Sequence, residues 1–246
     1  MRETNATNVT NAVNAVNVTN AMNVTLEQIQ AVGVMPVIAI SDTEKAVPLA
    51  RALAAGGIHC AEVTFRTEEG EEAIRRIAAE CPDILVGAGT VLTVEQADRA
   101  ARAGAKFAVS PGTNPKVVRR CAEIGLLIIP GCATPSDMEQ AMAFGLDTVK
   151  FFPAEQAGGL AYIKAVAAPY PKLRFVPTGG INAGNLGRYM AFPKVVACGG
   201  SWMVKKDLIE AGDFGEITRL CREAARIVKE ARQPCPSPTG DGRFLE

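Results

Sequence analysis

The sequence predicts an α/β fold in which eight strand–helix units form one (β/α)8 barrel. Short apolar runs typical of buried strands alternate with longer segments typical of helices through most of the 246 residues. This alternation implies a parallel sheet with right-handed crossovers, and eight units within roughly 200 residues fit a compact barrel. A doubly wound open sheet is the alternative, but its phosphate fingerprint G-x-G-x-x-G is missing after the first strand.

The predicted elements follow one another in a regular order. The strands cover residues 34–40, 58–65, 84–88, 106–109, 126–129, 147–152, 174–177 and 195–199. The helices cover residues 43–55, 68–80, 93–103, 114–124, 135–144, 159–168, 182–191 and 213–232. Asp42, Thr134 and Asn182 are suitable N-caps, because their side chains can accept a backbone N–H. Glycines lie just past several helix ends, where a left-handed residue is needed: Gly56, Gly57, Gly104, Gly125 and Gly145.

Two segments are expected to lie outside the barrel. In residues 1–24 asparagine recurs at every third position, a period that matches neither a helix face nor a strand face. We expect a disordered low-complexity tail, with a stacked polar ladder as the alternative. The capping-box pattern of Thr25-Leu26-Glu27-Gln28 predicts the start of a first helix. The barrel domain then covers residues 25–232, and the proline-rich residues 233–246 form a second loose tail.

Composition excludes several classes of function. The 26 basic and 26 acidic residues balance and form no basic cluster, so neither nucleic acid nor a membrane surface is expected as a partner. No apolar stretch approaches the length of a membrane span, and the N-terminus lacks the pattern of a secretory signal. The seven scattered cysteines indicate free thiols in a reducing cytoplasm. His59 is the only histidine, which excludes a metal site built on several imidazoles.

Lys150 is the most informative single residue, because it interrupts the apolar run of residues 147–152. A lysine is rarely buried without a partner. Burial favours the neutral form of an amine, which is a nucleophile that can form a Schiff base with a ketone. The structural alternative is a lysine whose amine reaches solvent beyond the end of the strand.

The second predicted strand supplies possible partners for Lys150. Glu62, Thr64 and Arg66 occupy alternate positions and therefore share one face of the strand. The opposite face is apolar and should pack against helices, so the polar face should point into the barrel. An ion pair between Glu62 and Arg66 is the structural alternative. A lysine arriving from another strand, at the end of the barrel where chemistry occurs, favours a catalytic pocket.

Glycines after the last two strands predict a phosphate site. Phosphate groups often bind to these loops in (β/α)8 barrels. Gly179-Gly180 and Gly199-Gly200-Ser201 supply exposed backbone N–H groups and a hydroxyl. The alternative is that these glycines only make tight turns. Paired glycines in both loops favour the ligand.

Together these segments resemble the KDPG/KHG aldolase family, whose members act on 2-dehydro-3-deoxy-6-phosphogluconate or 4-hydroxy-2-oxoglutarate. The matching motifs occur in the family's order and spacing between about Gly33 and about Lys229. They are E-V-T-F-R-T at 62–67, G-A-G-T at 87–90, S-P-G at 110–112, K-F-F-P-A-E at 150–155, P-T-G-G-I at 177–181 and G-G-S-W at 199–202. Two features depart from the family pattern, namely the asparagine repeat and Ser41-Asp42, where some relatives have a basic residue.

The resemblance implies a homotrimeric lyase that uses no metal or other cofactor and cleaves a phosphorylated 2-oxo acid to pyruvate and an aldehyde. It implies that Lys150 forms the Schiff base and that Glu62 is the general acid and base. The other implied substrate contacts are Arg66 and Thr90 for the carboxylate, Pro111 and Phe152 for the pocket, Thr178 for the hydroxyls, and Gly180, Gly200 and Ser201 for the phosphate, with Gly179 beside them.

Two other functions remain open from the residues. A sugar-phosphate epimerase or a thiamine-phosphate synthase would also bind phosphate in a barrel, but neither needs a lysine inside it. A barrel that binds a phosphorylated ligand without catalysis is the second alternative. The sequence does not rank the two aldolase substrates, because both contain the same 2-oxo-4-hydroxy acid core.

Overall fold

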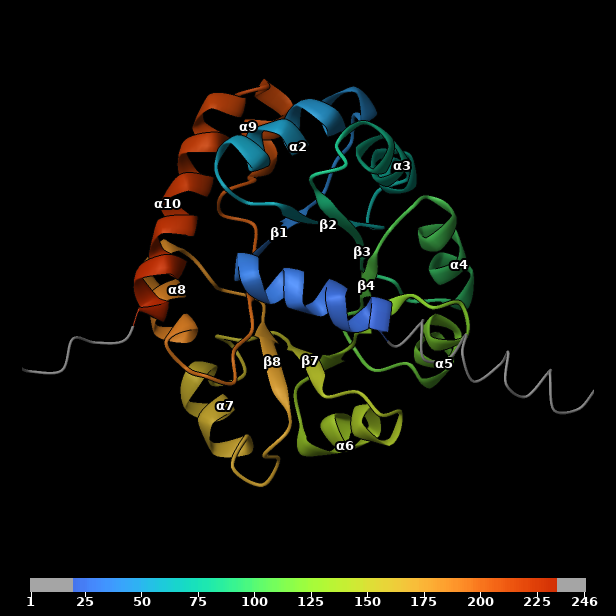
Figure 1. Ribbon diagram of the computed structural model, residues 1–246, viewed down its shortest axis with the longest axis vertical. Coiled ribbons are helices and arrows are strands. Elements are labelled where there is room, and N and C mark those ends of the chain that lie inside the picture. The colour runs from blue at the N-terminus through green and yellow to red at the C-terminus, as the bar shows by residue number, and fades with distance from the viewer. Residues whose placement is uncertain (1–19, 234–246) are drawn as a thin grey trace, which may run out of the picture.

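The computed structural model describes residues 20–233, which form a curled parallel sheet with helices around its outside (Figure 1). The strands are short and almost completely buried: β1 Val34–Ile38, β2 Cys60–Thr64, β3 Leu85–Gly89, β4 Phe107–Val109, β5 Leu127–Ile129, β6 Gly131–Cys132, β7 Thr148–Phe151, β8 Arg174–Pro177 and β9 Cys198–Gly200. Strands therefore occur in all eight predicted regions, with bounds that differ by a few residues.

The strands pair as two parallel sheets, one in the order β5-β4-β3-β2-β1-β9 and one in the order β6-β7-β8. Isolated bridges join Phe175 to Val195 and Thr178 to Gly199, and these bridges bring the end of the smaller sheet to the edge of the larger one. The fold is therefore TIM-barrel-like, with a parallel sheet that curls around its own interior.

The predicted strand at 126–129 differs from the expectation, because it continues as two short strands. Pro130 separates β5 from β6 and has no N–H with which to continue the ladder. Its carbonyl instead accepts a hydrogen bond from the N–H of Lys150, at 2.9 Å. β5 thus pairs with β4, whereas β6 pairs with β7.

The helices pack outside the strands and shield the apolar outer face of the sheet (Figure 1). They are η1 Thr43–Lys45, α2 Ala46–Ala55, α3 Gly70–Glu80, α4 Val94–Arg102, α5 Pro115–Glu123, α6 Pro135–Ala143, α7 Gly159–Val166, α8 Ala183–Met190, α9 Lys206–Ala211 and α10 Phe214–Arg232. The caps predicted at Asp42, Thr134 and Asn182 are confirmed. Gly57, not Gly56, is left-handed after α2.

An additional helix covers residues 20–32 and lies across one end of the curled sheet, where Figure 1 shows it in blue. The prediction that this helix starts at residue 25 is wrong, because residues 20–24 are already helical. Thr25 is inside this helix and not its cap, since its hydroxyl donates to the carbonyl of Ala21 at 3.0 Å. The parts of the two expected tails at 1–19 and 234–246 lie outside the described residues.

The helix of residues 20–32 has an apolar stripe that the asparagine repeat partly overlaps. This overlap explains why the last residues of the repeat were expected to belong to a tail. Met22, Leu26 and Ile29 recur at helical spacing and pack on the cluster of side chains inside the sheet. The asparagine repeat runs through residue 23, so it conceals the first apolar position of that stripe.

Removal of residues 2–24 should lower the melting temperature more than removal of residues 2–19. The longer deletion also removes the helical residues 20–24 and the apolar contacts of Met22, which are worth roughly 1–2 kcal/mol. For a domain of this size we expect a difference of a few degrees, on the order of 2–4 °C per kcal/mol. Thermal unfolding of the two truncated proteins measures it, and equal melting temperatures would show that residues 20–24 contribute nothing.

The strand alternation places the polar residues of β2 inside the sheet, as predicted. Cys60 belongs to the interior cluster, whereas Ala61 and Val63 pack with the helices. Glu62 and Thr64 therefore share the inner face with Cys60. The cysteines of the described residues are free and buried, in agreement with the expected free thiols. No helix within residues 20–233 is both long enough and apolar enough to span a membrane.

Candidate active site

The centre of the candidate site is an ion pair between Lys150 on β7 and Glu62 on β2. The Lys150 Nζ lies 3.5 Å from the Glu62 Oε1. Glu62 is completely buried and Lys150 is 6% exposed. The two strands belong to different sheets, so it is the curling of the sheet that brings the two charges together. The alternative of a lysine that reaches solvent is therefore wrong.

The Glu62 carboxylate accepts no hydrogen bond from any group in residues 20–233. Burying a carboxylate in this way is costly, and native proteins usually satisfy such oxygens. The cost is offset only in part by the Lys150 contact, because a pair at this distance lacks the hydrogen bonds that normally stabilise a buried ion pair. A free carboxylate beside an amine is, however, well placed to exchange protons with a bound molecule.

Gly89 holds the Glu62 side chain in place, and sequence reasoning did not single it out. Gly89 pairs with Thr64 across β2 and β3. A Cβ at Gly89 would overlap the Glu62 carboxylate, so only glycine leaves room for this rotamer. The sequence signal was the second glycine of G-A-G-T, which falls within a strand where glycine is normally unfavourable.

Two predicted pocket residues lie near Lys150. The Phe152 ring centroid is 5.3 Å from the Lys150 Nζ, within the range of a cation–π contact. The carbonyl of Pro111 packs against Gly131 so closely that a Cβ there would overlap it, and Gly131 is the register partner of Lys150. The structure therefore brings Phe152 to the lysine and Pro111 to the strand that neighbours it.

Thr90 and Arg66 continue the site from the ends of β3 and β2. Within residues 20–233, Thr90 is the only residue other than glycine with a positive φ, at 58°. This conformation is strained for a β-branched residue, and such strain clusters at functional sites. Arg66 donates from Nε to the Thr64 hydroxyl at 3.1 Å, and that hydroxyl donates to the Ile38 carbonyl at 2.8 Å. The Thr64 hydroxyl thus anchors the guanidinium at the mouth of the sheet.

A pocket at this mouth joins Arg66 to Gly180 and Ser201 from the predicted phosphate loops. Lys205 and Lys206 also line it. Sequence reasoning missed these two lysines, although only Met203 and Val204 separate them from G-G-S-W. They add positive charge near the end of β1, although Asp207 lines the same pocket.

The remaining loop glycines have conformations that fit their expected positions. Gly179 and Gly180 have φ values of 103° and 78°, which other residues rarely adopt. Gly200 packs under Trp202 and leaves no room for a side chain. Thr178 is buried and lies directly against Gly199, so the two loops touch.

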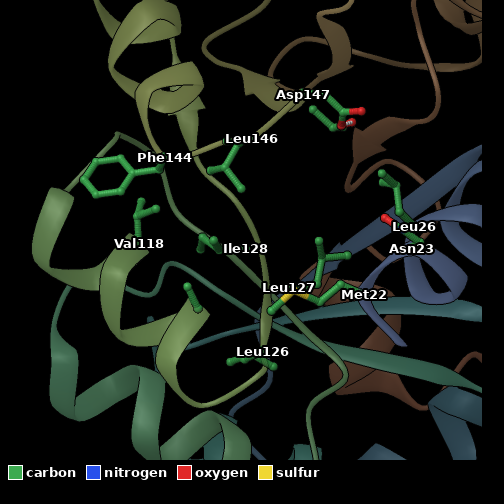
Figure 2. Close-up of a pocket in the computed structure, with 13 residues that line it drawn as sticks. Met22, Asn23, Leu26, Val118, Leu126, Leu127, Ile128, Phe144, Leu146 and Asp147 are labelled. Carbon is green, nitrogen blue, oxygen red and sulfur yellow. Dashed lines mark hydrogen bonds between the residues drawn. The ribbon is translucent and has the colours of Figure 1, made fainter. Parts of the chain in front are cut away.

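An apolar pocket at the opposite end of the sheet contains none of the predicted site residues. It opens at the N-terminal ends of β5 and β7, and Figure 2 shows Met22 and Leu26 of the first helix facing Leu127 and Leu146 across it. In the part of the chain that the structure describes, no group of three His, Cys, Asp or Glu side chains is arranged to hold a metal ion. The candidate site therefore comprises the buried Lys150–Glu62 pair and the pocket that Arg66 lines at the mouth of the sheet.

Fold and site together define a class: a TIM-barrel-like protein with an amine and a carboxylate buried together inside the curled sheet. The sequence profile of the family described as KDPG and KHG aldolase matches residues 8–220. The chain belongs to this family, which confirms the resemblance, and it is an aldolase, a lyase that breaks a carbon–carbon bond.

Individual relatives agree with the family. The chain is 55% identical over 202 residues to the 2-dehydro-3-deoxy-phosphogluconate aldolase of Treponema pallidum, which covers 82% of this chain and 96% of the relative. It is 46% identical over 196 residues to the KHG/KDPG aldolase of Escherichia coli, with 80% and 92% covered. Its structure resembles that of the KDPG aldolase of Legionella pneumophila with pyruvate captured as a covalent carbinolamine, with a TM-score of 0.79, 40% identity, and 81% and 97% covered.

Proposed function

We propose that this chain is a class I aldolase that cleaves 2-dehydro-3-deoxy-6-phosphogluconate to pyruvate and glyceraldehyde 3-phosphate. It also cleaves 4-hydroxy-2-oxoglutarate to pyruvate and glyoxylate. The observation that carries the proposal is the buried Lys150–Glu62 pair, with its 3.5 Å separation. An amine that can form an imine, next to a carboxylate that can move a proton, is the pair of groups that this cleavage needs.

The reaction begins when Lys150 gives a proton to Glu62 and the resulting amine adds to the C2 ketone of the substrate. Glu62 returns this proton to the hydroxyl of the carbinolamine, which leaves as water, and the iminium ion that remains draws electrons from the C3–C4 bond. Glu62 takes the proton of the C4 hydroxyl as this bond breaks, and the aldehyde leaves. The remaining enamine receives a proton at C3 from Glu62, and water then hydrolyses the iminium to release pyruvate and the protonated Lys150 amine, which restores the ion pair with Glu62. The Glu62 carboxylate also stabilises the positive charge of the iminium.

The other predicted residues hold the substrate along the mouth of the sheet. Arg66 binds the carboxylate, because its planar fork can donate two parallel hydrogen bonds, and Thr90 assists it. Pro111 and Phe152 shape the pocket around the imine, and Thr178 contacts the substrate hydroxyls. The phosphate is bound by the loop groups Gly179, Gly180, Gly200 and Ser201. The two lysines that line the same pocket support an anionic group at this end.

A pyruvate-release assay with the purified protein tests the proposed function. Both substrates should yield pyruvate without added metal. Absence of turnover with both would favour a barrel that only binds a phosphorylated ligand. Absence of a covalent adduct on a lysine after treatment with pyruvate and borohydride, together with absence of pyruvate release, would favour another phosphate-binding barrel enzyme, such as an epimerase or a thiamine-phosphate synthase.

Substitution of Ser201 by alanine should raise the KM for the phosphorylated substrate by roughly 10- to 100-fold, because a hydrogen bond to a charged group is worth about 1.5–3 kcal/mol. The kcat/KM for 4-hydroxy-2-oxoglutarate should change little. Steady-state kinetics with both substrates measure the difference. Ser41→Ala is the matched control, since Ser41 also follows a strand but lies outside this pocket. Equal losses for both substrates would indicate a packing defect and not a lost phosphate contact.

The proposal includes the wider organisation of the protein. With β5 and β6 counted as one strand interrupted at Pro130, the two sheets complete an eight-stranded (β/α)8 barrel, supported by the bridges that join β8 to the segment of β9. We infer that the barrel domain includes the helix of residues 20–32 and ends near residue 232. The buried free thiols support a cytoplasmic protein. We expect a homotrimer, which size-exclusion chromatography with light scattering measures.

A further inference from the structure

Tyr189 on α8 makes a polar contact that the proposed mechanism does not use. Its ring is 1% exposed, and its hydroxyl donates a hydrogen bond to the Glu155 carboxylate. Burial, followed by the Glu155 contact, raises the pKa of Tyr189, so the hydroxyl keeps its proton and remains a donor. The hydrogen bond from the buried Tyr189 therefore holds the exposed Glu155 carboxylate against α8.

Glu155 lies directly on the loop that is expected to bind phosphate. The N–H of Ala154 donates to the carbonyl of Thr178 at 2.8 Å, and the N–H of Glu155 donates to the carbonyl of Gly179 at 3.1 Å. A Cβ at Gly180 would lie 2.7 Å from the Glu155 Cβ, so the two residues are packed as closely as a glycine allows. The segment after β7 therefore forms one wall of the glycine loop.

Helix α8, which carries Tyr189, also holds the loop of Gly179 and Gly180. The carbonyl of Gly180 accepts hydrogen bonds from the side-chain amides of Asn182 and Asn185, at 3.2 and 3.0 Å. Both asparagines belong to the capping box of α8, the helix that carries Tyr189. Within residues 20–233, the N–H groups of Gly179 and Gly180 donate to no protein group. The carbonyls of the loop are thus tied back, while its N–H groups are left for a ligand.

We propose that Tyr189 and Glu155 are positioning residues that set the phosphate loop relative to Lys150 and thereby determine the preference for phosphorylated substrates. Glu155 lies five residues after Lys150 in the chain, in K-F-F-P-A-E. A hydrogen bond from α8 to Glu155 therefore connects the strand of the reacting amine to the helix that holds Gly180. This inference rests on the proposed function, because it assumes that the loop binds the phosphate of the substrate.

We call the hydrogen bond between Tyr189 and Glu155 the clamp. Tyr189→Phe tests the clamp, because it removes only the hydroxyl and keeps the buried ring. We expect the kcat/KM for 2-dehydro-3-deoxy-6-phosphogluconate to fall roughly tenfold, mainly through KM, as for the loss of one hydrogen bond to a charged group. The kcat/KM for 4-hydroxy-2-oxoglutarate should stay within about twofold, since that substrate has no phosphate to misplace. Equal losses for both substrates, or no loss for either, would overturn the inference.

Two variants of Glu155 separate the hydrogen bond from general packing. Glu155→Gln keeps an acceptor for the Tyr189 hydroxyl and should retain the selectivity of the unmodified protein. Glu155→Ala removes the acceptor and should reproduce the selective loss of Tyr189→Phe. If Glu155→Gln were as defective as Glu155→Ala, the negative charge and not the clamp would control selectivity, and the inference would be wrong.

Trapping of pyruvate on Lys150 with borohydride tests the proposed function separately. All three variants should trap pyruvate as the unmodified protein does, because none of the changes touches the amine. If the unmodified protein does not trap pyruvate, the proposed function fails. If it traps pyruvate but the variants lose both substrates equally, only the clamp is overturned.

Discussion

Substitution of Lys150 should abolish nearly all turnover and all covalent trapping of pyruvate. In the proposed mechanism the imine forms on Lys150, so we expect kcat/KM to fall by more than roughly 10³-fold, which corresponds to over 4 kcal/mol of lost transition-state stabilisation. Lys150→Ala leaves the buried Glu62 carboxylate without its cation, which destabilises the fold. Lys150→Met keeps the volume of the stem and is therefore the better companion variant. Both should remain folded by circular dichroism but give no pyruvate.

Incubation with pyruvate and borohydride measures the covalent step directly. The tryptic peptide that contains Lys150 should gain the mass of one reduced pyruvyl group. Lys164→Ala is the control, since Lys164 is an exposed lysine on α7 and should leave the label and the turnover intact. A label on another lysine, with Lys150 unmodified, would contradict the assignment.

Lys150 and Glu62 could be identified from the sequence because the patterns that single them out extend over only a few neighbouring residues. A period of two along β2 separates Glu62 and Thr64 from Ala61 and Val63, and a single lysine within an apolar run indicates an inward charge. The order of strands and helices follows from the same local signals, and caps such as Thr134 confirm the helix starts. These features need no knowledge of how distant parts of the chain meet.

The contacts that arise from the curling of the sheet could not be predicted in this way. The close fit of Gly89 against Glu62 depends on the register of β2 and β3, and the Tyr189–Glu155 bond joins residues 34 positions apart. The break at Pro130 was visible in the sequence, but its consequence, a strand that changes partners, depends on two neighbours. The periodicity of apolar residues and the secondary-structure propensities describe one strand or helix at a time, whereas these contacts join several strands and helices.

Substitution of Glu62 by glutamine should slow the proton transfers while leaving imine formation measurable. The amide has the shape of the carboxylate but cannot accept a proton, so kcat should fall by roughly 10²–10⁴-fold, the usual contribution of a general acid and base. Lys150 should still be trapped with pyruvate and borohydride, because the amine is unchanged. Exchange of the pyruvate methyl protons with deuterated water reports the enamine step alone and should fall by a similar factor.

Gly89→Ala gives an independent test of the same assignment, because it leaves the carboxylate present but displaces it. The added methyl group would overlap the Glu62 carboxylate, so the side chain must rotate away from Lys150. Methyl-proton exchange should then fall although Glu62 is intact, whereas trapping at Lys150 should persist. Gly112→Ala is the matched control, since nothing lies within 4 Å of a Cβ at that position. Unchanged exchange in both Glu62→Gln and Gly89→Ala would mean that another group moves the proton, because the two variants disturb Glu62 by different physical means.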